Sequence, residues 1–422
     1  MIAHDRVDIR VGDCRTLLRA MPAESVDCVV TSPPYFGLRD YGAGDAEIGR
    51  EPTPAEFVAA LVDVFREVRR VLRPSGTAWV NLGDSYAGSW GSRGRQGSGG
   101  LMADRAVARN RTAGYQVRAA GVSKKGTPPA GIKPKDLMML PARLAIALCD
   151  DGWRLRSDII WHKPNAMPES ITDRPTSAHE HVFLLTKARR YFYDAAAIAE
   201  PATQAERRAT FRGGAYCNGS TYDNSGPGGK STETGNIKSE IATRNARNVW
   251  TIATEPFTGA HYAVMPTKLA ERCILAGTSA KGYCSDCGAP WERQIERVDQ
   301  GYNGSRYGER AVAATGGARS GGTARSTLGS SNGRLTGKTE TVGWAATCDC
   351  GAAPRPGLVL DPFGGAGTTG LAAARHGRRA ILLELSPQHA ETARARIAAE
   401  WREGRAAPTA DVTPLALFGD AP

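Results

Sequence analysis

The stretch that decides the fold is Leu358-Val-Leu-Asp-Pro-Phe-Gly-Gly-Ala-Gly-Thr-Thr-Gly370, a short hydrophobic run followed by a glycine-rich turn and the start of a helix. Glycines let the backbone approach a ligand closely, and the first N–H groups of the helix are free to bind it. The stretch lacks the Gly-Lys-Ser/Thr ending of a P-loop, and Asp361 would repel phosphate. It therefore favours S-adenosylmethionine over a dinucleotide as the ligand, with a purely structural turn as the alternative.

Short β-branched hydrophobic runs alternate along the chain with longer amphipathic segments. The runs predict buried strands near 26–30, 77–82, 159–161, 181–185, 358–360 and 380–385. The segments predict helices near 54–72, 135–150, 266–276, 368–376 and 387–401. This alternation is typical of an α/β protein with an open, mostly parallel, twisted sheet of Rossmann-like type. Glu384, in the last strand, is placed to accept hydrogen bonds from a ribose diol.

The overall charge points to a polyanionic partner. The 422 residues include 54 Lys and Arg against 43 Asp and Glu, a net charge of +11, so nucleic acid is the first candidate. No apolar run reaches the ~18 residues of a membrane span, and the charged N-terminus lacks the apolar core of a signal sequence. We therefore expect a soluble, cytoplasmic protein with no membrane partner.

Three stretches rich in Gly, Ser, Thr, Asn and Arg interrupt the alternation, at about 88–135, 203–247 and 299–343. They contain too few apolar residues to order themselves and predict flexible insertions. The first holds ten Lys or Arg residues and a single acid, Asp104. We expect the electrostatic partner to bind this segment, and a solvated loop without a partner is the alternative.

The hydrophobic run at 26–30 leads into Ser32-Pro33-Pro34-Tyr35. Two prolines fix two φ angles and remove two N–H donors, which leaves backbone carbonyls free to accept hydrogen bonds at the end of the strand. Such a ledge suits an exocyclic amino group. Ser32 Oγ and a backbone carbonyl can hold its two N–H hydrogens while Tyr35 stacks on the base. A chance Ser-Pro-Pro-Tyr in a loop is the alternative.

Nine cysteines without an export signal argue against a disulfide framework. Two close pairs, Cys284 with Cys287 and Cys348 with Cys350, are each followed by glycine and predict a structural Zn²⁺ site. Sixty residues separate the pairs and the second is Cys-x-Cys, so reduced surface thiols are the alternative. A catalytic zinc would need a His-x-Glu partner, whereas His179-Glu180-His181 falls inside an apolar strand and predicts core residues.

With these motifs in view, the sequence resembles the permuted amino-methyltransferases of DNA, the β arrangement of N4-cytosine and N6-adenine enzymes of phage or restriction-modification type. In this family the catalytic motif precedes the cofactor motif. The similar segments occur in the family's order and cover most of the chain. They are 11–18, 31–42, 71–84, 152–165, 179–187, 249–250, 261–266 and 361–370.

The resemblance implies S-adenosylmethionine as the cofactor. It assigns the ribose hydroxyls to Glu384 and the adenine side to Asp13. For the methionine moiety it implies Asp361, Phe363, Gly365 and Gly367 at the glycine turn, and the segment 261–266 with His261 and Pro266 at its ends. Thr368 is also expected to bind the cofactor.

The resemblance assigns the target base to Ser32, Pro33, Pro34 and Tyr35. Serine in the first position is seen more often with N4-cytosine enzymes, so cytosine N4 is favoured over adenine N6. We expect direct methyl transfer to the amino nitrogen of a base flipped out of double-stranded DNA.

The cysteines outside the two close pairs do not follow a proline, as the cysteine does in enzymes that attack a ring carbon through a thiolate. A non-catalytic DNA-binding protein, or a methyltransferase for RNA or a protein amide, is the alternative.

The predicted organisation is one methyltransferase domain over 1–402. Its core comprises 1–87, 132–200 and 248–402. A basic insertion at 88–131 and a candidate target-recognition insertion at 203–247 separate the core ranges. A zinc-knuckle-like insertion at 278–353, with its flexible loop at 299–343, falls within the last range, and a tail follows at 403–422. The sequence leaves the recognition site, a companion restriction enzyme and the oligomeric state open.

Overall fold

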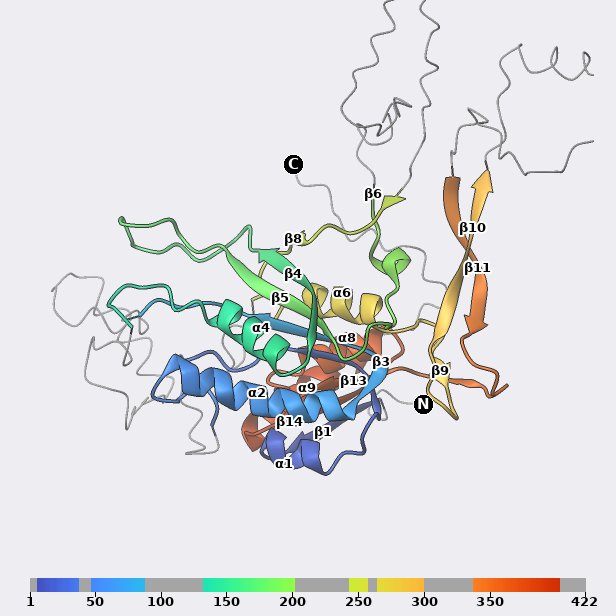
Figure 1. The fold of residues 1–422 in the computed structure, drawn as a ribbon, viewed down its shortest axis with the longest axis horizontal. Coiled ribbons are helices and arrows are strands. Elements are labelled where there is room, and N and C mark those ends of the chain that lie inside the picture. Colours follow the sequence, from blue (N-terminus) through green and yellow to red (C-terminus); the bar gives the residue numbers. More distant parts are fainter. Residues whose placement is uncertain are drawn as a thin grey trace, which may run out of the picture. The chain divides into compact units, whose positions relative to one another are not determined.

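The computed structural model describes residues 6–37, 47–87, 132–201, 243–256, 264–299 and 337–402. The chain divides into two compact units, and the larger comprises 1–198, 247–292 and 346–422. The larger unit is built on an eight-stranded sheet with the order β1-β14-β13-β2-β3-β5-β4-β8 (Figure 1). In that order the strands are Val7–Val11, Arg379–Glu384, Leu358–Asp361, Val26–Thr31, Leu72–Leu82, His179–Thr186, Arg154–His162 and Val249–Thr251.

This sheet is mixed rather than uniformly parallel. Five of its described strand pairings are parallel, and two are antiparallel because β5 runs against both β3 and β4. All six residues of β2 are buried, as expected for a parallel strand covered on both faces. The sequence analysis missed β1, because this edge strand alternates valine and isoleucine with charged residues instead of forming an apolar run.

Helices cover both faces of the sheet, because successive side chains of a strand point to opposite faces. On one face, Val29 and Ala78 belong to a hydrophobic cluster with buried residues of α1 (Cys14–Arg19), α2 (Pro54–Val71) and α4 (Leu140–Asp150). On the other, Cys28 lies against Gly277 of α6 (Thr267–Gly277), where a Cβ would be 2.8 Å from the thiol sulfur. Helix α8 (Thr368–Arg375) packs against α6, and α9 (Pro387–Arg402) contacts α8.

Several predicted boundaries differ from the structure; the strand predicted at 159–161, for example, is β4 and begins at Arg154. The helix expected from residue 135 begins only at Leu140, because Met139 has a left-handed backbone (φ 54°) and a proline occupies the first turn. The strand expected at 77–82 begins at Leu72, directly after α2. Pro74 and Gly76 in its first half hid this extension from the sequence pattern.

The smaller unit comprises 199–246 and 293–345. Its described parts include paired strands β6 (Glu200–Pro201) and β7 (Thr243–Arg244), and most of the two-stranded sheet of β10 (Trp291–Asp299) and β11 (Gly337–Ala346). Arg293 donates to Thr341 Oγ1 at 2.9 Å. The loop predicted to be flexible over 299–343 is therefore a strand from Gly337 onward, since its threonine, valine and tryptophan residues favour strand pairing.

Several predicted segments lie outside the described residues. They are the basic insertion at 88–131, positions 300–336 of the predicted loop and the tail at 403–422. The candidate target-recognition insertion at 203–247 is described only from Thr243. Within the described ranges, no helix combines the length and the apolar character that crossing a membrane requires.

The carboxylate of Asp27 ties the amino-terminal end of β2 to its neighbours. The side chain is fully buried and accepts hydrogen bonds from Arg355 Nη1 and Nη2 at 2.7 and 3.0 Å and from the Leu358 N–H at 2.8 Å. Arg73 Nε lies 3.2 Å from it. One carboxylate thus links β2 to β3, to β13 and to the short strand β12 (Pro354–Arg355).

Asp27→Asn should lower the free energy of unfolding by about 2 to 3 kcal/mol, because two partly buried guanidinium groups lose their fully buried carboxylate. Chemical denaturation measures the difference. Asp63→Asn is the matched control: Asp63 pairs with Arg66 on the exposed face of α2, and its loss should cost less than about 1 kcal/mol. Equal stability of Asp27→Asn and the unsubstituted protein would show that the buried carboxylate contributes nothing net.

Candidate active site

A cavity opens at the carboxyl ends of the central parallel strands. This edge is where open α/β sheets bind their ligands. The described lining consists of residues 12–14, 32–35, 47–48, 264–265, 361–366 and 383–385, with Thr368 and His389. The glycine turn after β13 and the proline ledge after β2 therefore open into the same cavity.

Asp361, the last residue of β13, is held by three donors. Thr31 Oγ1 donates to Oδ1 at 2.6 Å, the Phe363 N–H donates to the same oxygen at 3.0 Å, and Thr369 Oγ1 donates to Oδ2 at 2.7 Å. Burial raises the pKa of Asp361 to about 6, and these hydrogen bonds oppose a larger rise. The bond from Thr31 joins the end of β2 to the end of β13.

The glycine turn adopts a backbone that other residues rarely reach. Gly365 and Gly367 have φ values of 48° and 78°, and a Cβ at Gly367 would lie 2.9 Å from Ala393 Cβ of α9. The Gly365 N–H donates to Glu384 Oε2 at 2.8 Å. Burial by itself would raise the pKa of Glu384, but the hydrogen bonds it accepts outweigh burial and lower the pKa. Glu384 thus stays ionised while it braces the turn.

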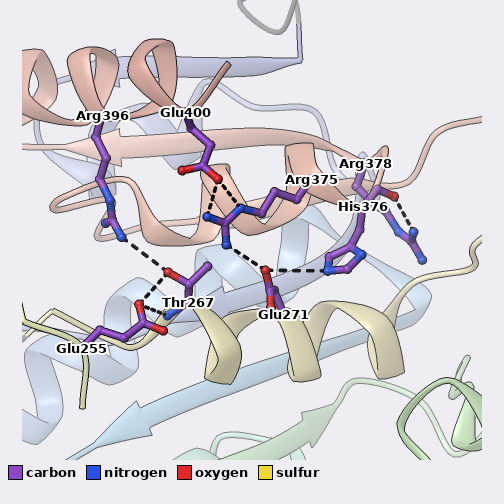
Figure 2. A network of polar contacts seen from close by, with 8 residues as sticks. All are labelled: Glu255, Thr267, Glu271, Arg375, His376, Arg378, Arg396 and Glu400. Carbon is purple, nitrogen blue, oxygen red and sulfur yellow. Dashed lines mark hydrogen bonds and ion pairs between the residues drawn. The ribbon is translucent and has the colours of Figure 1, made fainter. Parts of the chain in front are cut away.

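Arg396 of α9 supports the turn, and Figure 2 shows the polar contacts that join α6, α8 and α9 beside it. Arg396 donates to the Ala366 carbonyl at 3.1 Å and to Thr368 Oγ1 at 2.8 Å, and lies 3.5 Å from Thr267 Oγ1. Glu255 accepts from the N–H and Oγ1 of Thr267 at 3.0 and 2.9 Å. The sequence analysis missed Arg396 and Glu255, because neither belongs to a motif and only the packing of α6 and α9 brings them here.

Ser32 to Tyr35 leave the end of β2 and turn into the cavity. The Tyr35 hydroxyl donates to Glu180 Oε2 at 2.6 Å, and Ser32 Oγ accepts from Asn81 Nδ2 at 3.4 Å. Burial, together with the charge of Glu180, raises the pKa of Tyr35 well above its usual value, so the hydroxyl stays protonated. The sequence analysis gave Glu180 to a core strand and no role to Asn81.

The cavity lining includes ten of the residues predicted for cofactor and base. They are Asp13, Ser32, Pro33, Pro34, Tyr35, Asp361, Phe363, Gly365, Thr368 and Glu384. Gly367 and Pro266 are not among the lining residues: Gly367 precedes α8 as its N-cap, and Pro266 does the same for α6. His261 lies outside the described residues. Hydrogen bonds from Arg15 to Asp13 lower the pKa of that carboxyl, so it is ionised.

The described lining is acidic, although the whole chain is basic. It carries the carboxylates of Asp13, Glu47, Asp361 and Glu384 and no lysine or arginine side chain. Such a lining attracts a cation and repels phosphate. Cys14 also faces the cavity, and burial raises the pKa of its thiol to about 12. A nucleophilic thiolate is therefore not present there at neutral pH.

The four paired cysteines converge in a second cluster. The Sγ atoms of Cys284, Cys287, Cys348 and Cys350 all lie within 4.8 Å of one another. Gly288 follows the first pair with φ 74°, which allows its N–H to donate to the Cys284 carbonyl at 3.0 Å in a tight turn. Strand β9 (Tyr283–Cys284) pairs with β12, which brings the second pair alongside. None of the four cysteines lines the cavity described above.

An acidic glycine turn at the carboxyl edge of an α/β sheet accepts a nucleoside that carries positive charge in place of phosphate. The fold and the cavity therefore define an α/β protein that binds a nucleoside-type cofactor. The DNA methylase family matches residues 26–287 and 352–395, more than half of the chain, and the chain belongs to that family. The family resemblance recognised in the sequence is thus confirmed.

Two relatives with assigned activities are type II methyltransferases. M.SmaI from Serratia marcescens is 40% identical over 281 residues, which cover 66% of this chain and 77% of that protein. M.Cfr9I from Citrobacter freundii is 42% identical over 275 residues, which cover 65% of this chain and 74% of that protein. Among solved structures, the cytosine-N4-specific PvuII DNA methyltransferase is 16% identical, with a TM-score of 0.47 over 94% of this chain and 92% of that one.

The affinity for S-adenosylmethionine should fall about tenfold between about pH 7.5 and pH 5, because Asp361 takes up a proton with a pKa of about 6. The pKa values of Asp13 and Glu384 are lowered, so neither changes charge in this window. Calorimetric titration at both pH values measures the change. Asp361→Asn is the control and should bind weakly at both; a tenfold loss that persists in this variant would assign the titration to another group.

Proposed function

We propose that this protein transfers the methyl group of S-adenosylmethionine to an exocyclic amino nitrogen of a base in double-stranded DNA, with N4 of cytosine favoured over N6 of adenine. The observation that carries the proposal is the shared cavity. The acidic glycine turn and the Ser32–Tyr35 ledge open into it together, although 330 residues separate Thr31 from its hydrogen-bond partner Asp361. A cofactor and a target base can therefore meet inside one enclosure.

The described residues of the cavity fit S-adenosylmethionine. Asp361 and Asp13 are carboxylates, Phe363 offers an apolar ring, and Glu384 keeps one ionised carboxyl for the ribose hydroxyls. When bound, the cofactor supplies an electrophilic methyl group on a sulfonium. The negative lining compensates that positive charge and the charge of the amino group.

The proline ledge binds and orients the target amino group. Ser32 Oγ and the carbonyls freed by the two prolines accept hydrogen bonds from the N–H groups of the target amino group and so direct its lone pair to the methyl. The methylated nitrogen then releases one proton to water. Holding the two partners in line removes much of the entropic barrier. The protonated thiol of Cys14 speaks against a covalent ring intermediate. Since an amino group inside a duplex cannot reach this cavity, the base is flipped out to enter it.

The choice of partner and base rests on sequence features. The stretch 88–135 carries ten Lys or Arg residues and one acid, which suits the phosphate backbone of a DNA duplex. The catalytic segment at 32–35 precedes the cofactor segment at 361–370, the permuted order. Serine rather than an acidic residue begins the tetrad, which favours cytosine.

Incubation of the purified protein with S-adenosylmethionine and PCR-amplified duplex DNA should yield N4-methylcytosine, detected by mass spectrometry of the digested nucleosides. Tyr35→Ala should lower turnover by up to about 100-fold at near-normal cofactor affinity, since stacking contributes about 1 to 3 kcal/mol. N6-methyladenine as the product would support methyl transfer to an amino group but show that the target base is adenine and not cytosine. Methyl groups on RNA but not on DNA would contradict the proposal.

We also propose that Cys284, Cys287, Cys348 and Cys350 hold one structural Zn²⁺. Four thiolates around zinc at 2.3 Å lie about 3.8 Å apart, and the observed separations of up to 4.8 Å need only side-chain adjustment to reach this value. Four protein ligands fill a tetrahedral site and leave no position for a substrate. The ion would tie residues 284–287 to 348–350 and close the base of the long insertion between them.

Protein purified without chelator or metal-affinity tag should contain about one zinc per chain by elemental analysis. Replacing both Cys348 and Cys350 by serine should remove the metal and lower the melting temperature, because four thiolates no longer cross-link the two turns. Cys149→Ser, a single exposed cysteine on α4, is the control and should change neither. Less than half an equivalent of zinc would overturn the assignment.

A further inference from the structure

A buried acidic side chain lies directly behind the proline ledge. Glu180 of β5 is 8% exposed and does not line the cavity. Its Oε2 accepts from the Tyr35 hydroxyl at 2.6 Å and from Asn81 Nδ2 at 2.8 Å, and its Oε1 is bound by Lys163 Nζ. Three donors from three different segments thus converge on one carboxylate that the proposed reaction does not use.

The sheet brings these groups together through its antiparallel strand. In the ladder between β4 and β5, Glu180 pairs with Trp161, and Lys163 follows the end of β4. Gly83, just beyond β3, leaves the space that the cluster needs: a Cβ there would lie 3.0 Å from Tyr35 Cε2 and 3.2 Å from Glu180 Cδ. The missing side chain at Gly83 lets the tyrosine ring and the carboxylate approach each other.

The charges in the cluster are balanced. The ammonium group of Lys163 forms an ion pair with Glu180, so the buried carboxylate has a counter-charge beside it. The raised pKa of Tyr35 keeps its hydroxyl protonated, so the tyrosine is the donor and Glu180 the acceptor. A charge-assisted O–H···O⁻ bond is shorter and stronger than a neutral one, so it restrains the tyrosine ring firmly.

Asn81 extends the cluster to the other end of the ledge. Its Nδ2 lies 3.3 Å from the Tyr35 hydroxyl oxygen and 3.4 Å from Ser32 Oγ. The positions of Nδ2 and Oδ1 cannot be exchanged, because the amide oxygen would then face the carboxylate oxygen of Glu180. The remaining atom, Oδ1, is buried without a hydrogen-bond partner among the described residues. An amide present only for stability would be expected to satisfy both of its ends.

We propose that Glu180 is a positioning residue for the base-binding ledge: it fixes the ring of Tyr35 directly, and the oxygen of Ser32 through Asn81, in the geometry that receives the flipped base. This inference rests on the proposed function, and it explains which contacts hold the ledge rigid. A stacking ring that is already restrained loses little entropy when the base arrives. Small misplacements of reacting groups are expensive, up to about 100-fold in rate for a shift of about 1 Å.

Glu180→Gln tests the proposal, because it keeps the size of the side chain and leaves Lys163 facing an amide instead of a carboxylate. Turnover on PCR-amplified duplex DNA should fall ten- to a hundredfold, while calorimetric affinity for S-adenosylmethionine stays within about twofold of the unsubstituted protein. Glu67→Gln is the matched control: Glu67 of α2 is a partly buried carboxylate bonded to Arg70 Nε at 2.8 Å and does not line the cavity, so turnover should stay near normal in this variant. Normal turnover in Glu180→Gln would overturn the proposal.

The double-mutant cycle with Tyr35→Phe separates positioning from plain stability. If Glu180 acts through the tyrosine hydroxyl, Tyr35→Phe alone lowers turnover, and the double variant is little worse than either single one. If the losses of turnover in the two single variants multiply in the double variant, the proposal is overturned. Normal turnover in Tyr35→Phe would also overturn it, and this measurement remains possible if Glu180→Gln fails to fold. Failure of the unsubstituted protein to methylate DNA would instead contradict the proposed function.

Discussion

The hydrogen bond from Thr31 to Asp361 is the interaction on which the site depends. It joins the ends of β2 and β13, which are neighbours in the sheet but 330 residues apart in the chain. Asp361 at the same time binds Thr369 of α8 and the Phe363 N–H, so one carboxylate sets the strand spacing, the path of the turn and the start of the helix. Its burial, which raises its pKa to about 6, is the cost of that central position.

Charge is distributed according to the two kinds of partner. The cavity presents carboxylates to a small cation, whereas the chain as a whole carries a charge of +11. An acidic cavity in a basic chain favours a cationic ligand locally, while the net charge of the chain favours a polyanion. The cysteine cluster and the Asp27 carboxylate lie outside the cavity; they join β2, β9 and β12 by contacts between segments distant in sequence.

Most of the residues predicted for cofactor and base line the cavity, because they lie in contiguous motifs whose chemistry can be read locally. Ser32 to Tyr35 and Asp361 to Thr368 are of this kind. The residues that support them were not predictable. Glu180 reads as one polar position in an apolar strand, and Arg396 as one of several arginines on an amphipathic helix. Each acquires a role only through its contacts, so no local pattern distinguishes it.

By itself the sequence determined the α/β alternation, the glycine turn, the proline ledge and the pairing of the four cysteines, because short-range periodicity and fixed spacings encode these features. Tertiary structure alone decided that β5 runs antiparallel, that the two motifs open into one acidic cavity, and that Glu180 and Asn81 lie behind Tyr35. These outcomes depend on which strands become neighbours, and that choice reflects burial summed over the whole sheet rather than the preference of any one segment.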